Sequence, residues 1–321
     1  MRRRLPPEGI PVAAPAREAR GDAPMTAASP DAARGSSWTI LPLVEACAGT
    51  FREHGLEEPR LNAELLLGRV LGLRRIQLYT NFDRPVGVAE LQAFRSLARR
   101  RMEREPLQYI LGETEFMGLV FEVSPAVLIP RPETEVLTER ALELLRAGGS
   151  AEPSVLDLGT GAGNIAVSIA HAFPGARVTG MDASRAALAL AERNRIRHGA
   201  SGVRLVEGDV FGDSCAALPL QDLILSNPPY LSPQEFSAAQ PEVRLYEPRM
   251  ALCDEEDGLR FIRRIAHLAS TVLRSGGTLL VEVGYDQSAE AVRIFRGAGL
   301  EGVRTWKDAA GIERVVEGAG R

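Results

Sequence analysis

The stretch Ser154-Val155-Leu156-Asp157-Leu158-Gly159-Thr160-Gly161-Ala162-Gly163-Asn164 joins a short apolar run to three alternating glycines. The run 154–158 predicts a buried strand, and the residues from Asn164 to Ala172 predict a helix. Glycines between a strand and a helix allow a sharp turn and let the backbone approach a ligand closely. Taken alone, this loop fits a structural turn, a dinucleotide site or a site for another cofactor.

Strands and helices continue to alternate after this loop. The strand-like runs cover residues 176–181, 203–206, 222–225 and 278–283, and the helical patterns cover 184–198 and 258–273. Alternation in such short units is typical of a parallel, doubly wound α/β sheet. In such a sheet, ligands bind outside the carboxyl ends of the strands, which is where the glycine loop would lie. We therefore predict an α/β domain over residues 132–321, with a helix from Thr134 to Leu145 near its start.

The residues before this domain predict two smaller units and a tail. Apolar residues at helical spacing form three stripes within 38–106, which predicts a small helical bundle. The β-rich run from Glu115 to Val123 predicts a hairpin inside a linker, 107–131. Residues 1–37 are rich in Ala, Pro, Arg and Gly, and we expect a disordered tail in which Met25 is an alternative start.

The composition is that of an ordinary soluble protein, with 45% hydrophobic and 25% charged residues. The net charge of −4 argues against a general nucleic-acid coat. The three cysteines are scattered and form no CxxC pair, so we expect neither a disulfide framework nor a metal site. No apolar run approaches the length of a membrane span, and we expect a cytoplasmic protein.

Acidic residues mark the ends of the first three predicted strands of the α/β domain. Asp182 comes 25 residues after Asp157, where a carboxylate can accept the two hydroxyl hydrogens of a ribose. Asp209 follows the third strand and is placed for an adenine amine, with Val210 or Phe211 as an apolar wall. Each aspartate alone could instead cap a helix. Three acids at neighbouring strand ends favour a cofactor that contains a nucleoside, and the lack of a GxxxxGK[ST] loop disfavours an NTPase.

The run Ser226-Asn227-Pro228-Pro229-Tyr230-Leu231 directly follows an apolar strand. Two prolines offer no N–H to a sheet, so the strand must end here with a fixed backbone. The side-chain oxygen of Asn227 can accept one hydrogen of a planar NH₂ group, and a rigid proline carbonyl can accept the other. Tyr230 can then lie against that planar group. The alternative is a rigid turn at the strand exit with Tyr230 in the core.

The order D-x-G-x-G-x-G, two further acids and N-P-P-Y resembles the S-adenosylmethionine-dependent methyltransferases of the Rossmann-like class. In that class the cofactor carries a cationic sulfur and no pyrophosphate, so several acids around it make electrostatic sense. The resemblance implies S-adenosylmethionine as the cofactor and a planar amino group as the methyl acceptor. The motif leaves open whether that nitrogen belongs to DNA adenine, an RNA base or a protein glutamine.

A second resemblance covers nearly the whole chain beyond the tail. It is carried by QYILG (108–112), IPRPETE (129–135), DLGTGAGNIA (157–166), SNPPY (226–230) and VRLYEP (243–248). In this order they resemble the peptide chain release factor glutamine methyltransferases. That family methylates the side-chain amide (N5) of the glutamine in the Gly-Gly-Gln motif of bacterial class 1 release factors. Its fold joins a small helical N-terminal domain, a hairpin linker and a Rossmann-like catalytic domain.

The resemblance implies roles for individual residues. Asn227 and the backbone of Pro228, followed by Pro229, would hold the glutamine amide, with Tyr230 packed beside it. Arg131 and Glu133 either position the substrate loop or pin the linker to the domain. Val210 stands where some members have Trp, which leaves Phe211 as the candidate adenine wall. The candidate cofactor-binding residues are Asp157, Gly159, Thr160, Gly161, Ala162, Gly163, Asp182, Asp209, Phe211 and Asn227.

Alternative functions use the same chemistry on other substrates. One is a ribosomal protein glutamine methyltransferase, a branch that has Pro-Arg-Ser-Pro where this chain has Pro-Arg-Pro-Glu. Another is an adenine N-methyltransferase, which would need a basic groove with stacking aromatic residues, whereas aromatics are only 5% here. A third is a silent binding protein that keeps the cofactor fold. We expect a release factor as partner and no nucleic-acid substrate.

Four arginines end the third helical stripe, at Arg99, Arg100, Arg101 and Arg104. They are either a solvated helix end or a contact for an acidic partner.

Overall fold

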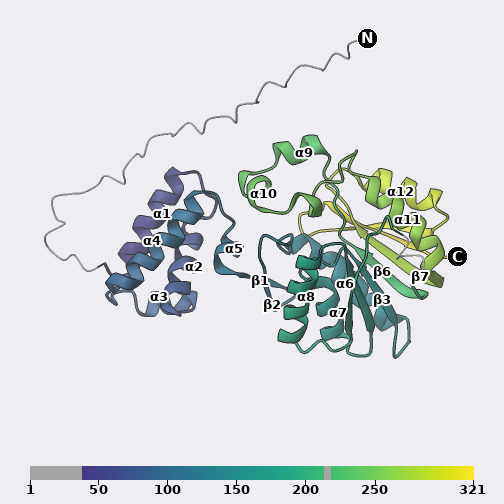
Figure 1. The fold of residues 1–321 in the computed structure, drawn as a ribbon, viewed down its shortest axis with the longest axis horizontal. Helices are drawn as coiled ribbons and strands as arrows, with labels where there is room; N and C mark the ends of the chain where they lie inside the picture. Colours follow the sequence, from purple (N-terminus) through teal and green to yellow (C-terminus); the bar gives the residue numbers. More distant parts are fainter. Residues whose placement is uncertain (1–37, 213–217) are drawn as a thin grey trace, which may run out of the picture.

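The computed structural model describes residues 38–212 and 218–321, and the predicted tail over 1–37 lies outside them. Figure 1 shows a group of helices at one end of the molecule and an α/β body at the other, with a small hairpin between them. The predicted fold class, a Rossmann-like α/β body with an N-terminal helical bundle, is confirmed. The division of the chain at residues 106 and 131 stays a prediction.

The helical group encloses a core of its own. Phe51, Leu66 and Phe94 are at most 2% exposed and belong to one apolar cluster that all its helices share. The structure adds two short helices, α3 and α5, to the three predicted stripes, and α5 lies within the predicted linker. The five helices are α1 (Ile40–Glu53), α2 (Pro59–Leu71), α3 (Arg75–Thr80), α4 (Val88–Met102) and α5 (Leu107–Leu111).

The predicted hairpin is confirmed as β1 (Glu113–Phe116) and β2 (Leu119–Glu122), which pair antiparallel. Its two turn residues, Met117 and Gly118, have φ of 52° and 72°, the left-handed conformation that a tight hairpin turn requires. Phe116 and Phe121 pack into the core of the α/β body. The hairpin is therefore fastened to that body and is not a free linker.

The α/β body contains a seven-stranded sheet in the order β5-β4-β3-β6-β7-β9-β8. The first five strands in that order run parallel, as predicted. The last two add an antiparallel edge that the sequence pattern did not indicate. The bounds are β3 (Ser154–Leu158), β4 (Arg177–Asp182), β5 (Val203–Glu207), β6 (Gln221–Ser226), β7 (Leu273–Glu282), β8 (Glu301–Lys307) and β9 (Glu313–Ala319).

Helices cover both faces of the sheet, because alternate residues of each strand point to opposite sides. Val155 of β3 packs in one apolar cluster with α6 and α7, whereas Leu156 packs in another with α11 and α12. A short 3₁₀ turn, η1 (Pro132–Thr134), leads into α6, and a segment with two short helices and another 3₁₀ turn, η3, joins β6 to α11. The bounds are α6 (Glu135–Ala147), α7 (Asn164–Ala172), α8 (Arg185–Arg197), α9 (Pro233–Ala238), α10 (Pro241–Tyr246), η3 (Arg249–Ala251), α11 (Arg260–Val272) and α12 (Ser288–Gly297).

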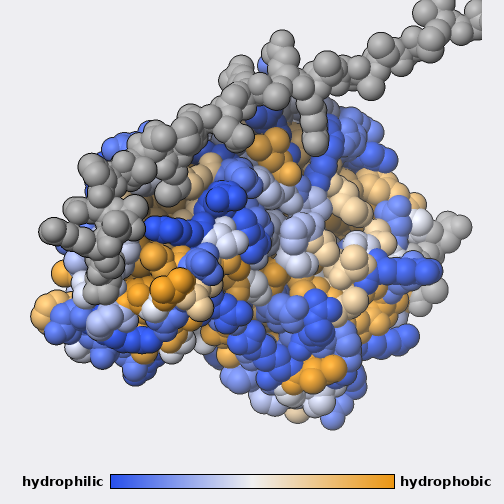
Figure 2. Space-filling view, turned by 60° about the vertical axis from the view of Figure 1, so that its left-hand side comes forward, coloured by the Kyte–Doolittle hydropathy of each residue, from blue (hydrophilic) through white to orange (hydrophobic). Residues whose placement is uncertain are grey.

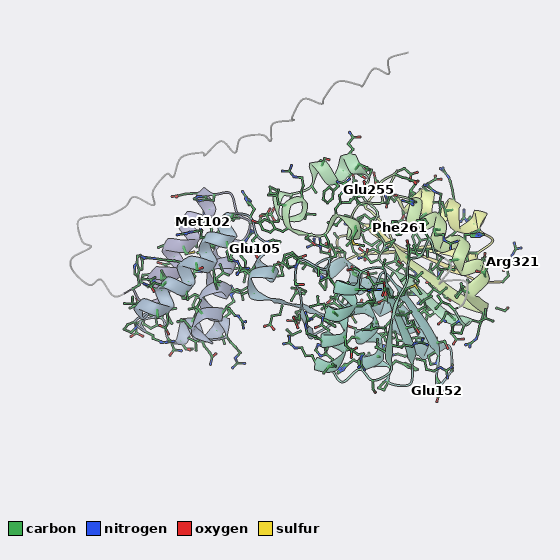
Figure 3. All side chains as sticks on the ribbon, in the orientation of Figure 1. Met102, Glu105, Glu152, Glu255, Phe261 and Arg321 are labelled. Atoms are coloured by element: carbon green, nitrogen blue, oxygen red, sulfur yellow. The ribbon has the colours of Figure 1, made fainter. Side chains whose placement is uncertain are left out.

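Ion pairs from Arg101 of α4 and from Arg104, two residues after it, to Glu242 of α10 connect the helical group to the α/β body. The Glu242 carboxylate accepts hydrogen bonds from Arg101 at 3.2 Å and from Arg104 at 3.3 Å. Arg101 is only 7% exposed and also donates to the side-chain oxygen of Asn62 at 2.7 Å. Figure 3 labels Met102 and Glu105, which lie where α4 ends, on the side toward the α/β body. Arg100 pairs with Glu105 as well, so three of the four clustered arginines contact an acid of the same chain.

The surface mixes hydrophilic and hydrophobic residues on the face that Figure 2 shows. Large exposed hydrophobic residues of the helical group include Ile76, Phe82 and Val88. Within the described ranges, no helix combines the length and the hydropathy that crossing a membrane requires.

We predict that Arg101→Ala lowers the free energy of unfolding by roughly 3 kcal/mol, because it leaves the buried Asn62 oxygen without its partner and removes one of the two arginines that pair with Glu242. The matched control is Arg99→Ala on the same helix, where the side chain is exposed and the change should stay within about 0.5 kcal/mol. Urea denaturation followed by circular dichroism measures both. Equal stability of the two variants would contradict the role given to Arg101.

Candidate active site

A cavity of about 600 Å³ opens at the carboxyl ends of β3, β4 and β6. Figure 3 labels Phe261 and Glu255, which line this cavity, and Glu152, which precedes β3 and lies at the opposite end of the body. The cavity is where ligands bind in open parallel sheets. Its walls come from the β3–α7 loop, the residues after β4, β5 and β6, and the segment that contains η3.

The parallel register brings the predicted site residues to one edge. Leu158, the last residue of β3, pairs with Met181 on one side and with Ser226 on the other. The glycine loop, Asp182 and Asn227 follow these three positions directly, so they lie side by side.

The glycine loop turns tightly with all three glycines at positive φ, between 55° and 78°. The backbone N–H groups of Gly159 and Thr160 both donate to the carbonyl of Met181, at 2.8 and 2.9 Å. Gly159 and Gly161 line the cavity, as do Thr160 and Ala162. Gly163 does not: it faces α8, where a Cβ would come within 3.1 Å of the Ala191 side chain. Gly163 therefore serves helix packing.

Asp157 lies behind the loop and does not line the cavity. Its carboxylate is fully buried and accepts a 2.6 Å hydrogen bond from the Thr160 hydroxyl through Oδ2. Within the described ranges, Oδ1 has no hydrogen-bonding partner. Burial raises the pKa of Asp157 to about 7. The structure thus gives Asp157 a contact that holds the loop.

Asp182 lines the cavity and is fixed between two loops. Its Oδ2 accepts from the backbone N–H of Gly161 at 2.9 Å, and its Oδ1 accepts from that of Ser184 at 2.8 Å. Burial raises its pKa. Ser184 is the residue that caps α8, so Asp182 is not a helix cap. Each carboxylate oxygen keeps a further lone pair for hydroxyl groups of a ligand.

An apolar wall stands beside Asp209, which is exposed and also lines the cavity. The Phe211 ring meets Phe261 edge to face, with centroids 5.0 Å apart, and the Arg260 guanidinium lies 4.3 Å from its centre. Val210 lines the cavity as well. A planar ring could therefore pack here.

Asn227 carries an unused acceptor. Its Nδ2 donates to the Thr134 hydroxyl at 3.0 Å, whereas its Oδ1 is buried without a hydrogen-bonding partner in the part of the chain that the structure describes. Asn227, Pro228 and Pro229 all line the cavity. Tyr230 does not line it: its carbonyl accepts from the Gln287 side chain at 2.8 Å, and burial raises its pKa to about 12.

Arg131 and Glu133, the two candidate site residues of the IPRPETE stretch, differ in their placement. Arg131 lines the cavity and forms an ion pair with the buried Glu247, which also accepts from the backbone N–H of Ile129 at 3.2 Å. Arg131 thus ties this stretch to the VRLYEP motif. Glu133 is exposed and does not line the cavity, although its charge raises the pKa of Glu282.

Several residues at the site were not predicted from the sequence. Thr134 lines the cavity and holds Asn227, and Glu282 lies close behind Thr134. The segment from Pro248 to Glu255 supplies a further wall. Thr134 and Pro248 lie inside two of the motifs quoted above, which was the available signal for them.

Comparison with known proteins gives matches to both parts of the chain. The family model described as the PrmC N-terminal domain matches residues 43–112, and the one described as the methyltransferase small domain matches residues 135–243. A release factor glutamine methyltransferase from Geobacter sulfurreducens is 48% identical, over 88% of this chain and 96% of the relative. A protein of the same name from Chlorobaculum tepidum is 45% identical, over 86% of this chain and 96% of the relative.

Among solved structures, the hMettl16 catalytic domain in complex with an RNA hairpin is similar, with a TM-score of 0.51 and 16% identity. The match covers 74% of this chain and 82% of that one. At this identity the likeness concerns the fold alone.

We predict that Asp157→Asn removes a pH dependence of stability. The folded protein binds a proton at Asp157 up to about pH 7, whereas the unfolded chain releases it near pH 4, so this stabilisation is lost as pH rises through 7. The free energy of unfolding of the wild type, relative to that of the variant, should therefore fall by roughly 2 kcal/mol between pH 5 and pH 8. Urea denaturation at the two pH values measures it, and parallel curves for the two proteins would refute the assignment.

Proposed function

The chain belongs to the family of release factor glutamine methyltransferases, and on that premise we propose how its site works and on what it acts. It is a methyltransferase that uses S-adenosylmethionine to methylate a protein glutamine. The acceptor that we propose is the N5 amide nitrogen of the glutamine in the Gly-Gly-Gln motif of bacterial class 1 release factors. The observation that carries the proposal is the buried, unpartnered Oδ1 of Asn227, within the described residues, at the wall of the cavity.

The cavity fits S-adenosylmethionine in size and in charge. Gly159 and Gly161 leave room for close approach, Asp182 suits ribose hydroxyls, and Asp209 with Phe211 suits an adenine ring. When bound, the cofactor supplies a methyl group on a cationic sulfur. A nitrogen lone pair can bond to that methyl carbon while the sulfur leaves.

The arginines that line the cavity do not make it a phosphate site. Arg131 pairs with Glu247, Arg249 pairs with Glu255 at 2.7 Å, and Arg260 lies 3.3 Å from Glu256. Because a carboxylate compensates each of these guanidinium groups, the cavity suits a cationic ligand.

Asn227 and Pro228 would hold the substrate amide. The amide nitrogen has a delocalised lone pair and two hydrogens that must be held while the nitrogen bonds to a methyl carbon. Asn227 Oδ1 would accept one hydrogen and the Pro228 carbonyl the other. These hydrogen bonds strengthen as the nitrogen becomes cationic, so they stabilise the transition state more than the ground state. The extra proton then leaves to water, and no side-chain base is required before attack.

The helical part, residues 38–106, would bind the folded release factor, the linker 107–131 would join it to the body, and residues 132–321 would carry out the reaction. A release factor as substrate also places the enzyme in the cytoplasm. A ribosomal protein or an adenine base could use the same Asn-Pro-Pro-Tyr chemistry. The relatives named above favour the release factor over these alternatives.

We predict that the protein transfers label from S-adenosylmethionine to a bacterial class 1 release factor, and that a Gln→Ala change in the Gly-Gly-Gln motif of that factor abolishes the labelling. Mass spectrometry should place the added methyl group on that glutamine. Ribosomal protein and total RNA, tested under the same conditions, are the controls. Labelling that persists on the Ala variant, or that occurs only on RNA, would overturn the proposed substrate.

We predict that Asn227→Ala lowers the rate of methyl transfer by roughly a hundredfold or more, because an acceptor for the amide hydrogen is lost. The dissociation constant for the cofactor should change by less than about threefold, since loop and strand-end residues form most of its site. The matched control is Asn81→Ala, an exposed asparagine at the end of α3. Single-turnover kinetics and calorimetry measure the two quantities, and an unchanged rate would exclude the role given to Asn227.

A further inference from the structure

Two buried polar residues lie next to the Asn227 amide, and the first of them, Thr134, also lines the cavity. Thr134 ends η1 and Glu282 ends β7, and each is 2% exposed. The Thr134 hydroxyl accepts the 3.0 Å hydrogen bond from Asn227 Nδ2. The Thr134 side chain also lies close enough to Glu282 to lower the pKa of that carboxyl group, against the effect of burial.

A hydroxyl group has only one hydrogen, and this limits how the three residues can be arranged. If Thr134 donates its hydrogen to the Glu282 carboxylate, its oxygen can only accept from Asn227. The amide NH₂ of Asn227 must then face Thr134, and its oxygen must face the cavity. The two ends of an Asn amide are nearly equal in size, so packing alone would not select this orientation.

We propose that Thr134 and Glu282 are positioning residues that fix which end of the Asn227 amide faces the substrate. This inference rests on the proposed function, because the orientation matters only if Asn227 Oδ1 accepts a hydrogen from the substrate amide. With the amide turned over, Asn227 would present NH₂ to the NH₂ of the substrate. Two donors would then face each other, and methyl transfer would slow.

The ionisation state of Glu282 determines whether the Asn227 amide keeps this orientation. Arg314 of β9 and Arg131 favour its ionised form, Glu133 disfavours it, and Tyr230 lies near enough to interact with it. Its Oε2 is buried and, in the described part of the chain, has no hydrogen-bonding partner. Burial raises the pKa of Glu282 to about 7. Above that pH the carboxylate can only accept, whereas below it the acid can donate to Thr134 and release the threonine hydrogen toward Asn227 Oδ1.

Replacing Thr134 tests the hydroxyl directly. Thr134→Val keeps the shape but removes the hydroxyl that accepts from Asn227, and it should lower the single-turnover rate at pH 8 by roughly tenfold to a hundredfold. The Michaelis constant for the release factor and the dissociation constant for the cofactor should change by less than about threefold. Thr134→Ser keeps the hydroxyl and should retain the rate within about threefold. The matched control is Thr138→Val, another buried threonine one turn further along, which should leave the rate unchanged.

Replacing Glu282 tests the charge. With saturating cofactor and release factor, the single-turnover rate of the wild type should fall as pH drops through about 7. Glu282→Gln cannot ionise, so this fall should disappear in the variant. The matched control is Glu317→Gln on the adjacent strand β9, a buried glutamate paired with Arg140 and Arg304, which should keep the wild-type pH profile.

The outcomes separate this inference from the proposed function. If the wild type methylates the release factor but Thr134→Val does so at the wild-type rate, the positioning role is wrong and the proposed function stands. A Thr134→Ser variant as slow as Thr134→Val, or a Glu282→Gln variant with the wild-type pH profile, would also overturn the positioning role. A wild type that labels no release factor would overturn both. If Thr134→Val does not fold, the pH profile of the Glu282→Gln variant still tests the positioning role.

Discussion

The parallel register of β3 with its two neighbours is the constraint on which the site depends. Leu158 pairs with Met181 on β4 and with Ser226 on β6, and each of these three residues directly precedes a functional segment. A slip of one residue in either pair would turn every side chain of that strand to the opposite face of the sheet. The glycine loop, the carboxylate of Asp182 and the amide of Asn227 therefore share one cavity only because the central strands end together.

Two threonines that line the cavity, Thr160 and Thr134, each lie next to a buried acid that does not line it. Thr160 donates to Asp157 beneath the glycine loop, and Thr134, which accepts from Asn227, lies close to Glu282. Burial raises the pKa of both acids to about 7, and each has one oxygen without a partner within the described residues. A buried polar group restricts the groups around it, because each available hydrogen must be shared out in one consistent way. In this view the two pairs hold the cofactor half and the substrate half of the site in fixed geometry.

Local patterns in the sequence predicted most of the fold, since the glycine loop, the strand runs and the helical stripes each depend on near neighbours. The antiparallel strands β8 and β9 were not predicted. Their direction depends on which strands they pair with, and a local sequence pattern does not show that pairing. The placement of the candidate site residues also depends in part on local patterns and in part on contacts between distant residues. Asp157 stands one residue before the end of β3, so the alternation along a strand turns its side chain into the body and away from the cavity. The link from Thr134 to Glu282 joins residues that are far apart in the chain, and no local pattern could indicate it.

In the proposed mechanism, Asn227 presents its side-chain oxygen to the amide of the substrate glutamine. A crystal structure with a class 1 release factor and S-adenosylhomocysteine, the product form of the cofactor, tests it most directly. We predict that the glutamine nitrogen lies about 3 Å from Asn227 Oδ1 while Asn227 Nδ2 stays bonded to Thr134. A glutamine bound outside the cavity, or an Asn227 amide that has left Thr134 and turned its nitrogen toward the substrate, would contradict it.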